Sequence, residues 1–295
     1  MTKILGIVSI LILAAAASAL AQSYAITYSD GTVEIKTAKG WSVLSIGDSV
    51  PLSATVRVSQ SGSLELTKGR ARLTILKDGT YEIARLASAA ELSGALGAGA
   101  RISQKLQSLT SDKPTSTTAG GVRAADQSSQ AAVTWVDEND EVRSEVVSLL
   151  AQKKYLDAAQ KLQEALDESP SPAYEQEFAY LAGVAYYGAG QPVRAFRALS
   201  KVSPDPSVQW YARYVILKTQ LLVDSLDYSG ALDILQPFLS ANPSGEPAQL
   251  AWLLTYYCQK GLGNTSAARA ALDTGYQLDP ASETANLIDQ QRKAQ

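Results

Sequence analysis

The chain has 295 residues, a formal net charge of −3 and a pI near 5.2, with 46% hydrophobic and 19% charged residues. This balance is typical of a globular protein long enough for two modest domains, and the lack of basic surplus gives no support to nucleic-acid binding. The chain contains no histidine, which removes the usual general base and the commonest zinc ligand. We therefore expect a non-catalytic protein that uses no cofactor and no metal.

The N-terminus has the pattern of a secretory signal peptide over residues 1–21. Lys3 precedes an apolar run from Ile4 to Ala17, and small residues up to Ala21 offer a cleavage site before Gln22. We expect a periplasmic or secreted protein, with an uncleaved N-terminal anchor as the alternative. The one cysteine, Cys258, cannot form an internal disulfide and lies in an apolar stretch, where a buried thiol is expected.

Residues 22–86 predict a small all-β domain, a sandwich or a roll. Apolar side chains alternate with polar ones, and glycine-containing turn signals separate the alternating segments. Trp41, directly after Gly40, is expected to fill the core rather than to stack on a ligand. The alternating pairs are Val33/Ile35, Val56/Val58, Leu64/Leu66, Leu73/Ile75 and Tyr81/Ile83.

This segment resembles the FecR-type periplasmic domain. The resemblance is carried in order by Gly40-Trp41, Gly47-Asp48, the stretch ATVRVSQSG and Asp78-Gly79, and further on by Gly121-Val122-Arg123. The better-known members of that family are signal transducers with a cytoplasmic helical domain and a transmembrane helix. The resemblance implies an exported domain and, as the alternative to an adaptor, a sensing role.

Residues 87–136 are expected to join two domains. An alanine-rich helix weakened by Gly94, Gly97 and Gly99 leads into a segment rich in Ser, Thr, Gly, Gln and Ala over residues 110–136. The glycines lack the Gly-Lys-Ser/Thr that follows a phosphate-binding loop. We interpret the segment as a linker.

Four copies of one pattern fill residues 137–295. Each copy has an alanine-faced helix ending before a proline, and the alignment alanines are spaced by 37, 36 and 37 residues. A preceding apolar helix accompanies each copy, so the unit is a helix pair that needs neighbours to bury its apolar faces. The alanines are Ala158, Ala195, Ala231 and Ala268, and the prolines are Pro170, Pro206, Pro243 and Pro280.

The repeated region resembles the tetratricopeptide repeat (TPR) family. Ala182-Gly183 with Tyr186, Trp252, the four alanines and the prolines carry the resemblance. It implies an α-solenoid of four helix pairs, with residues 284–293 as a final capping helix. Pro237 is expected to kink its helix or cut it short. The expected fold is thus α+β and multidomain.

In such stacks the first helix of each pair lines a concave groove, which implies a protein or peptide partner. Tyrosine and arginine among apolar groups suit a peptide. The open alternative is that some of these side chains fill the stack or dock the chain's own linker. The groove candidates are Tyr180, Val184, Tyr187, Arg213, Ile216, Gln220, Leu253 and Tyr257.

Two functional classes follow from these features. The first is an exported protein-binding adaptor or scaffold of the cell envelope, whose β-domain holds a second partner or a cell-wall component. The second is a sensing or regulatory subunit of a FecR-type signalling system. An enzyme ranks third, because carboxylate pairs such as Asp137 and Asp140 are common on any acidic helical surface.

Overall fold

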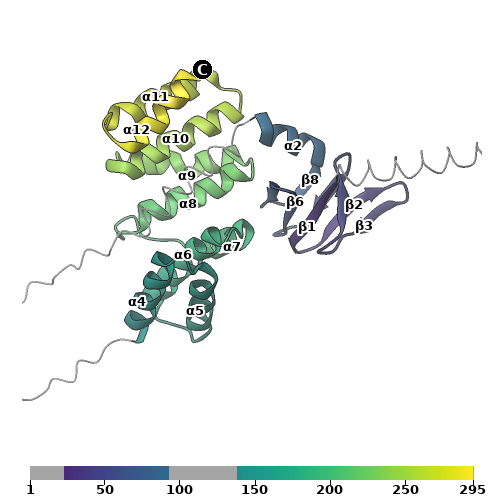
Figure 1. Ribbon diagram of the computed structural model, residues 1–295, viewed down its shortest axis with the longest axis horizontal. Helices are drawn as coiled ribbons and strands as arrows, with labels where there is room; N and C mark the ends of the chain where they lie inside the picture. Colours follow the sequence, from purple (N-terminus) through teal and green to yellow (C-terminus); the bar gives the residue numbers. More distant parts are fainter. Residues whose placement is uncertain (1–22, 93–137, 295) are drawn as a thin grey trace, which may run out of the picture. The chain divides into compact units, whose positions relative to one another are not determined.

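A computed structural model of the chain describes residues 23–92 and 138–294. An N-terminal all-β region, residues 23–82, is followed by a helical C-terminal region (Figure 1). By their contacts the described residues form two compact units, one made of residues 23–92 with 214–294 and the other of residues 138–213. The expected signal peptide, the linker 110–136 and the segment Gly121-Val122-Arg123 lie outside the described residues.

The all-β region contains two four-stranded antiparallel sheets, in the orders β4-β1-β6-β7 and β3-β2-β5-β8. The expected all-β region is therefore confirmed. The strands are β1 (Ser23–Asp30), β2 (Val33–Thr37), β3 (Gly40–Val43), β4 (Ser49–Pro51), β5 (Thr55–Val58), β6 (Ser63–Lys68), β7 (Ala71–Ile75) and β8 (Gly79–Glu82).

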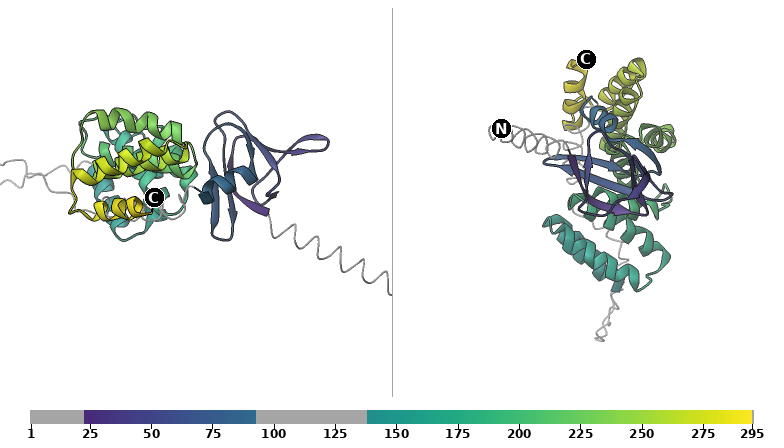
Figure 2. Two further views of the ribbon diagram at one scale, coloured as in Figure 1. Left: turned by 90° about the horizontal axis from the view of Figure 1, so that it is seen from above. Right: turned by 90° about the vertical axis from the view of Figure 1, so that its right-hand side faces the viewer.

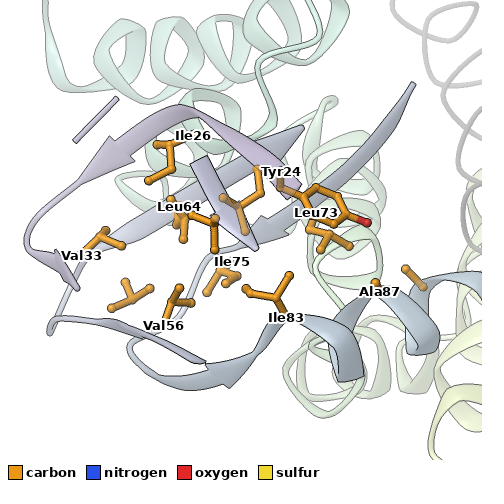
Figure 3. Packing of buried hydrophobic residues seen from close by; sticks show 13 residues of the cluster. Tyr24, Ile26, Val33, Val56, Leu64, Leu73, Ile75, Ile83 and Ala87 are labelled. Carbon is orange, nitrogen blue, oxygen red and sulfur yellow. The ribbon is translucent and has the colours of Figure 1, made fainter. Parts of the chain in front are cut away.

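One hydrophobic cluster joins the two sheets (Figure 3). Alternation along the strands places one side-chain set inward, as at Val56 and Val58 on β5 and Leu64 and Leu66 on β6. Glu65 between the two leucines is also buried, and its carboxylate accepts a 2.9 Å hydrogen bond from the Thr27 hydroxyl. The cluster thus rests on the predicted alternation, and the buried Glu65 carboxylate, on the opposite face of β6, has its own hydrogen-bond partner.

The predicted strand through Tyr81 and Ile83 is too long at its C-terminal end. Strand β8 ends at Glu82, and Ile83 is the first residue of helix α2 (Ile83–Leu92). Its backbone N–H donates to the Ala54 carbonyl at 3.0 Å, and its side chain is buried in the cluster. The alanine-rich sequence that follows favours a helix, which explains the switch at this residue.

Nine further helices are described in the C-terminal region, and most helices that follow each other in the chain pack together (Figures 1 and 2). Contacts join α4 to α5, α5 to α6 and α6 to α7, and likewise α9 to α10, α10 to α11 and α11 to α12. The helices are α4 (Glu138–Ala151), α5 (Tyr155–Asp167), α6 (Pro172–Gly188), α7 (Pro192–Ser200), α8 (Tyr211–Asp224), α9 (Tyr228–Ser240), α10 (Gly245–Gly261), α11 (Thr265–Leu278) and α12 (Glu283–Lys293).

The four alignment alanines lie at equivalent places in the helices. Ala158, Ala195, Ala231 and Ala268 are each the fourth residue of α5, α7, α9 and α11, and all four are buried. Each of these helices ends before its proline. Helix α9 continues to Ser240, so Pro237 does not cut it short; only three helical residues remain beyond it.

Two glycine contacts repeat in the helical region. A Cβ atom at Gly188, the last residue of α6, would clash with the ring of Tyr155, the first residue of α5. A Cβ atom at Gly261, the last residue of α10, would clash in the same way with the ring of Tyr228, the first residue of α9. In both cases 33 residues separate the tyrosine from the glycine. The same close approach therefore occurs twice at the same spacing.

Helix α12 is fixed to α10 by a buried amide. Gln249 on α10 donates to the carbonyls of Gly275 at 3.2 Å and Asp279 at 2.9 Å, and accepts from the Ser282 hydroxyl at 2.7 Å. The same Ser282 oxygen caps α12 by accepting from the Ala285 N–H at 2.9 Å. Every polar atom of the Gln249 side chain is thus satisfied although the residue is buried.

Among the described residues, none of the helices has the length and apolar character needed to cross a membrane. This finding concerns residues 23–92 and 138–294, and the apolar run near the N-terminus lies outside them.

Candidate binding surfaces

The eight predicted groove residues all lie on helices. Tyr180, Val184 and Tyr187 are on α6; Arg213, Ile216 and Gln220 are on α8; and Leu253 and Tyr257 are on α10. Their depths differ. Six of them are buried, whereas Tyr187 and Arg213 are partly exposed. The binding role of the set stays a prediction, and these two positions have the side-chain surface that a partner could reach.

Tyr180 is buried against Trp210. The two rings stack with centroids 4.8 Å apart and an interplanar angle of 10°. Burial raises the pKa of Tyr180 well above its ordinary value, and the neighbouring positive charge of Arg213 lowers that pKa only in part. The phenol is therefore neutral at physiological pH and lies next to a cationic guanidinium.

Trp210 is partly exposed and immediately precedes α8. It was not among the residues predicted from the sequence, although the stretch QWYAR places it three residues before Arg213. Tryptophan and arginine are the residue types most enriched at energetically dominant interface positions. Trp210 therefore offers a partly exposed aromatic surface, and Arg213, which also lies near Tyr180, offers a cationic hydrogen-bond donor.

Polar side chains are buried along α8. The Gln220 amide nitrogen donates to a carboxylate oxygen of Asp224 at 2.6 Å. Gln220 Oε1 and Thr219 Oγ1 are buried and have no hydrogen-bond partner among the described residues. Burial raises the pKa of Asp224 to about 7, against the lowering effect of the bond from Gln220. The two unpaired oxygens of Gln220 and Thr219 lower the free energy of unfolding, because each has lost its hydrogen bonds to water without gaining a partner in the protein.

Leu253 and Tyr257 are buried side chains of α10. The ring of Tyr257 lies 4.9 Å from that of Tyr256, centroid to centroid, and both rings are buried. The next residue, Cys258, is fully buried, and burial raises the pKa of its thiol to about 12. The expected buried cysteine is confirmed, and its thiol stays protonated at neutral pH.

A second candidate surface is the outer face of the sheet β3-β2-β5-β8. The register pairs Lys36 with Trp41, and Glu34 with both Val43 and Arg57. Trp41 is therefore on the face opposite to the core residue Val33, and it is partly exposed. The prediction that Trp41 fills the core is wrong, because the strand places it one residue out of phase with the inward set.

Arg57 covers one side of the Trp41 ring. Its guanidinium carbon lies 4.4 Å from the ring centroid, and its Nε donates to Glu34 Oε2 at 2.8 Å. This arrangement fixes the indole against the sheet by a cation–π contact and an exposed ion pair, each worth at most about 1 kcal/mol. The position of the Trp41 ring on this face is thus stabilised only weakly.

A hollow of about 420 Å³ lies between charged side chains of α11 and α12. Its charged side chains largely form ion pairs with one another. Arg292 Nε lies 2.9 Å from Asp273 Oδ1, and Lys293 Nζ lies 2.5 Å from Asp289 Oδ2. Within residues 23–92 and 138–294, no group of three His, Cys, Asp or Glu residues could hold a metal ion.

In comparison with known proteins, no family model matches the chain, and no curated protein matches it.

Proposed function

We propose that the chain is a non-catalytic, exported adaptor or scaffold that binds a protein or peptide partner through its helical region. In this proposal residues 137–295 are a TPR-like solenoid of four helix pairs, and residues 22–86 are a FecR-like domain for a second envelope partner. The observation that carries the proposal is the repeated close approach of Tyr155 to Gly188 and of Tyr228 to Gly261.

The repeated contact supports a stack of equivalent units. Each tyrosine begins the second helix of one copy, and each glycine ends the first helix of the next copy. A contact between successive copies is what a linear repeat needs, because each unit buries its apolar faces only against its neighbours. Binding is the usual work of such scaffolds, since stacking creates an extended surface.

The partner-binding position that we propose is formed by Trp210 and Arg213, with Tyr187 as a further candidate. All three side chains are partly exposed, whereas Tyr180 supports Trp210 from below by stacking. An aromatic ring beside a guanidinium suits a peptide that offers an apolar side chain and a carboxylate, because arginine binds carboxylates through two parallel hydrogen bonds.

The test is photocrosslinking in intact cells with the crosslinking residue placed at Arg213. We expect one protein adduct, which mass spectrometry would identify. The matched control places the same residue at Leu156, which is 57% exposed on α5. An adduct of equal yield at both positions, or at neither, would contradict binding at this place.

A further inference from the structure

Strand β3 forms one edge of its sheet and carries unusually exposed apolar side chains. Within the described residues its neighbour is β2, and the sheet order places it last (Figure 1). Val43 on β3 is 65% exposed, and Ile46 in the following turn is 61% exposed. In the described part of the chain, these two are the most exposed of five large apolar side chains that face solvent.

The register shows which backbone groups of β3 are open. The Leu44 N–H donates to the Val33 carbonyl at 2.8 Å, so residues 33 and 44 form a hydrogen-bonded pair. Such pairs alternate in an antiparallel ladder, which makes Ile35 and Ser42 the next one. The N–H and C=O groups of Trp41 and Val43 therefore point away from β2. No hydrogen bond of theirs is present among the described residues.

The other three sheet edges have features that oppose pairing. Strand β4 contains Pro51, β7 contains Arg72, and β8 contains Glu82 and continues directly into α2. Prolines, charges and covering elements are the usual means of protecting an edge strand. Strand β3 contains neither a charged residue nor a proline, and four residues of length are its one limiting feature.

We propose that the β3 edge pairs with the β3 edge of a second copy of this chain, antiparallel and centred on Ser42. In this register Trp41 faces Val43 of the other copy, and Val43 faces its Trp41. Both are hydrogen-bonded pairs, so the four open N–H and C=O groups of each edge are all satisfied. Ser42 lies opposite Ser42 of the other copy, and these two form a non-hydrogen-bonded pair. The two four-stranded sheets that contain β3, one from each copy, thereby join into one continuous eight-stranded sheet.

Side chains on the outer face are compatible with this register. Trp41 and Val43 lie on the same face, so each junction gains two aromatic and β-branched cross-strand pairs. The neighbouring residues on β2 are Lys36 beside Trp41 and Glu34 beside Val43. Each row across the junction therefore begins with a lysine and ends with a glutamate, and no like charges meet.

The junction is short, which sets its strength. Two four-residue strands bury far less than the roughly 1,200 Å² of a stable standard interface. The dimer should therefore form reversibly, between about 10 µM and 1 mM protein. A second copy is the occupant that fits this edge in particular, because the pattern of open groups and side chains is self-complementary about Ser42.

The register can be tested by disulfide trapping of the full chain. Ser42→Cys should crosslink under mild oxidation, since a non-hydrogen-bonded pair places the two Cα atoms about 4.5 Å apart. Val43→Cys is the matched control. It lies one residue away, but its distance to the same residue of the other copy is roughly 7 to 8 Å, too far for a disulfide. Cys258 is buried and does not compete.

Sedimentation velocity tests the free equilibrium. We expect the unmodified chain to shift from monomer to dimer with concentration, and Val43→Pro to remain monomeric by removing an N–H that faces the open edge while leaving the β2 pairing intact. Leu156→Lys, on α5, should dimerise like the unmodified chain. A monomer at every concentration, equal trapping at positions 42 and 43, or an undiminished Val43→Pro dimer would each overturn the proposal.

Discussion

In the all-β region thirteen buried side chains form one cluster that both sheets share, whereas in the helical region the same tyrosine–glycine contact recurs between neighbouring helices. A shared cluster makes the strands depend on one another, so damage at one side chain should weaken all of them. Repeated contacts act between neighbours, so damage there should stay local at first. The comparison teaches that the two regions should fail in different ways.

The largest effect is expected for Leu66→Ala in the shared cluster. Leu66 is fully buried, and its truncation should lower the free energy of unfolding by about 2 to 5 kcal/mol. Hydrogen exchange should show faster exchange in all eight strands while helices α4 to α7, which belong to the other compact unit, keep their protection. Leu156→Ala, at an exposed position, should change neither region, and equal losses in both regions for Leu66→Ala would contradict the comparison.

A smaller effect is expected for Gly261→Ala, with a sign opposite to that of helix propensity. At an open helical position this change stabilises by about 0.5 to 1 kcal/mol, but here the new methyl group meets the Tyr228 ring. We expect a loss of about 1 to 3 kcal/mol in thermal or urea unfolding. In a Tyr228→Ala background the cost should largely disappear, and Gly188→Ala with Tyr155→Ala should show the same coupling.

The four helix starts before the alignment alanines offer a matched capping test. Asp227 accepts a hydrogen bond from the Gly230 N–H at 3.1 Å, whereas Asn264, at the equivalent position before α11, makes no side-chain cap bond. Asp227→Ala should therefore cost about 1 kcal/mol of unfolding free energy, and Asn264→Ala close to none. Equal costs would show that the cap bond contributes nothing at α9.

Asp224→Asn should remove a pH dependence. The pKa of Asp224 is raised from 3.8 to about 7, so the folded state holds a proton that the unfolded state has released. The unmodified chain should lose stability as pH rises from about 4 to about 7. Because the side chain is partly exposed, we expect the variant to gain about 1 kcal/mol at pH 8 and nothing at pH 4 in urea unfolding. A gain independent of pH would contradict this assignment.

The sequence predicted the helices and strands better than it predicted which of their side chains are buried. Alternation identified β2, β5, β6 and β7, because their inward side chains are all large and apolar. Strands β3 and β4 gave little signal, since three or four residues with an outward Trp41 do not alternate visibly. The alanine spacing identified helices α5, α7, α9 and α11, because each of these helices carries a buried alanine at its fourth residue.

For the candidate site, helical periodicity predicted which side chains share one face of a helix, but not whether that face is exposed or buried. Ile216 and Tyr257 lie on the predicted helices yet are buried, which no single-helix pattern can indicate. Trp210 precedes its helix, where no periodicity applies, so only its stacking on Tyr180 identifies it. Depth of this kind depends on tertiary packing.

Binding of the crosslinked partner to purified variants tests the adaptor proposal most directly. Trp210→Ala and Arg213→Ala should each weaken binding at least about thirtyfold, roughly 2 kcal/mol, with little change in melting temperature. Tyr257→Ala should instead lower the melting temperature and leave the affinity of the folded protein unchanged, because its ring is buried. Unchanged affinity in both Trp210→Ala and Arg213→Ala would contradict partner binding at this surface.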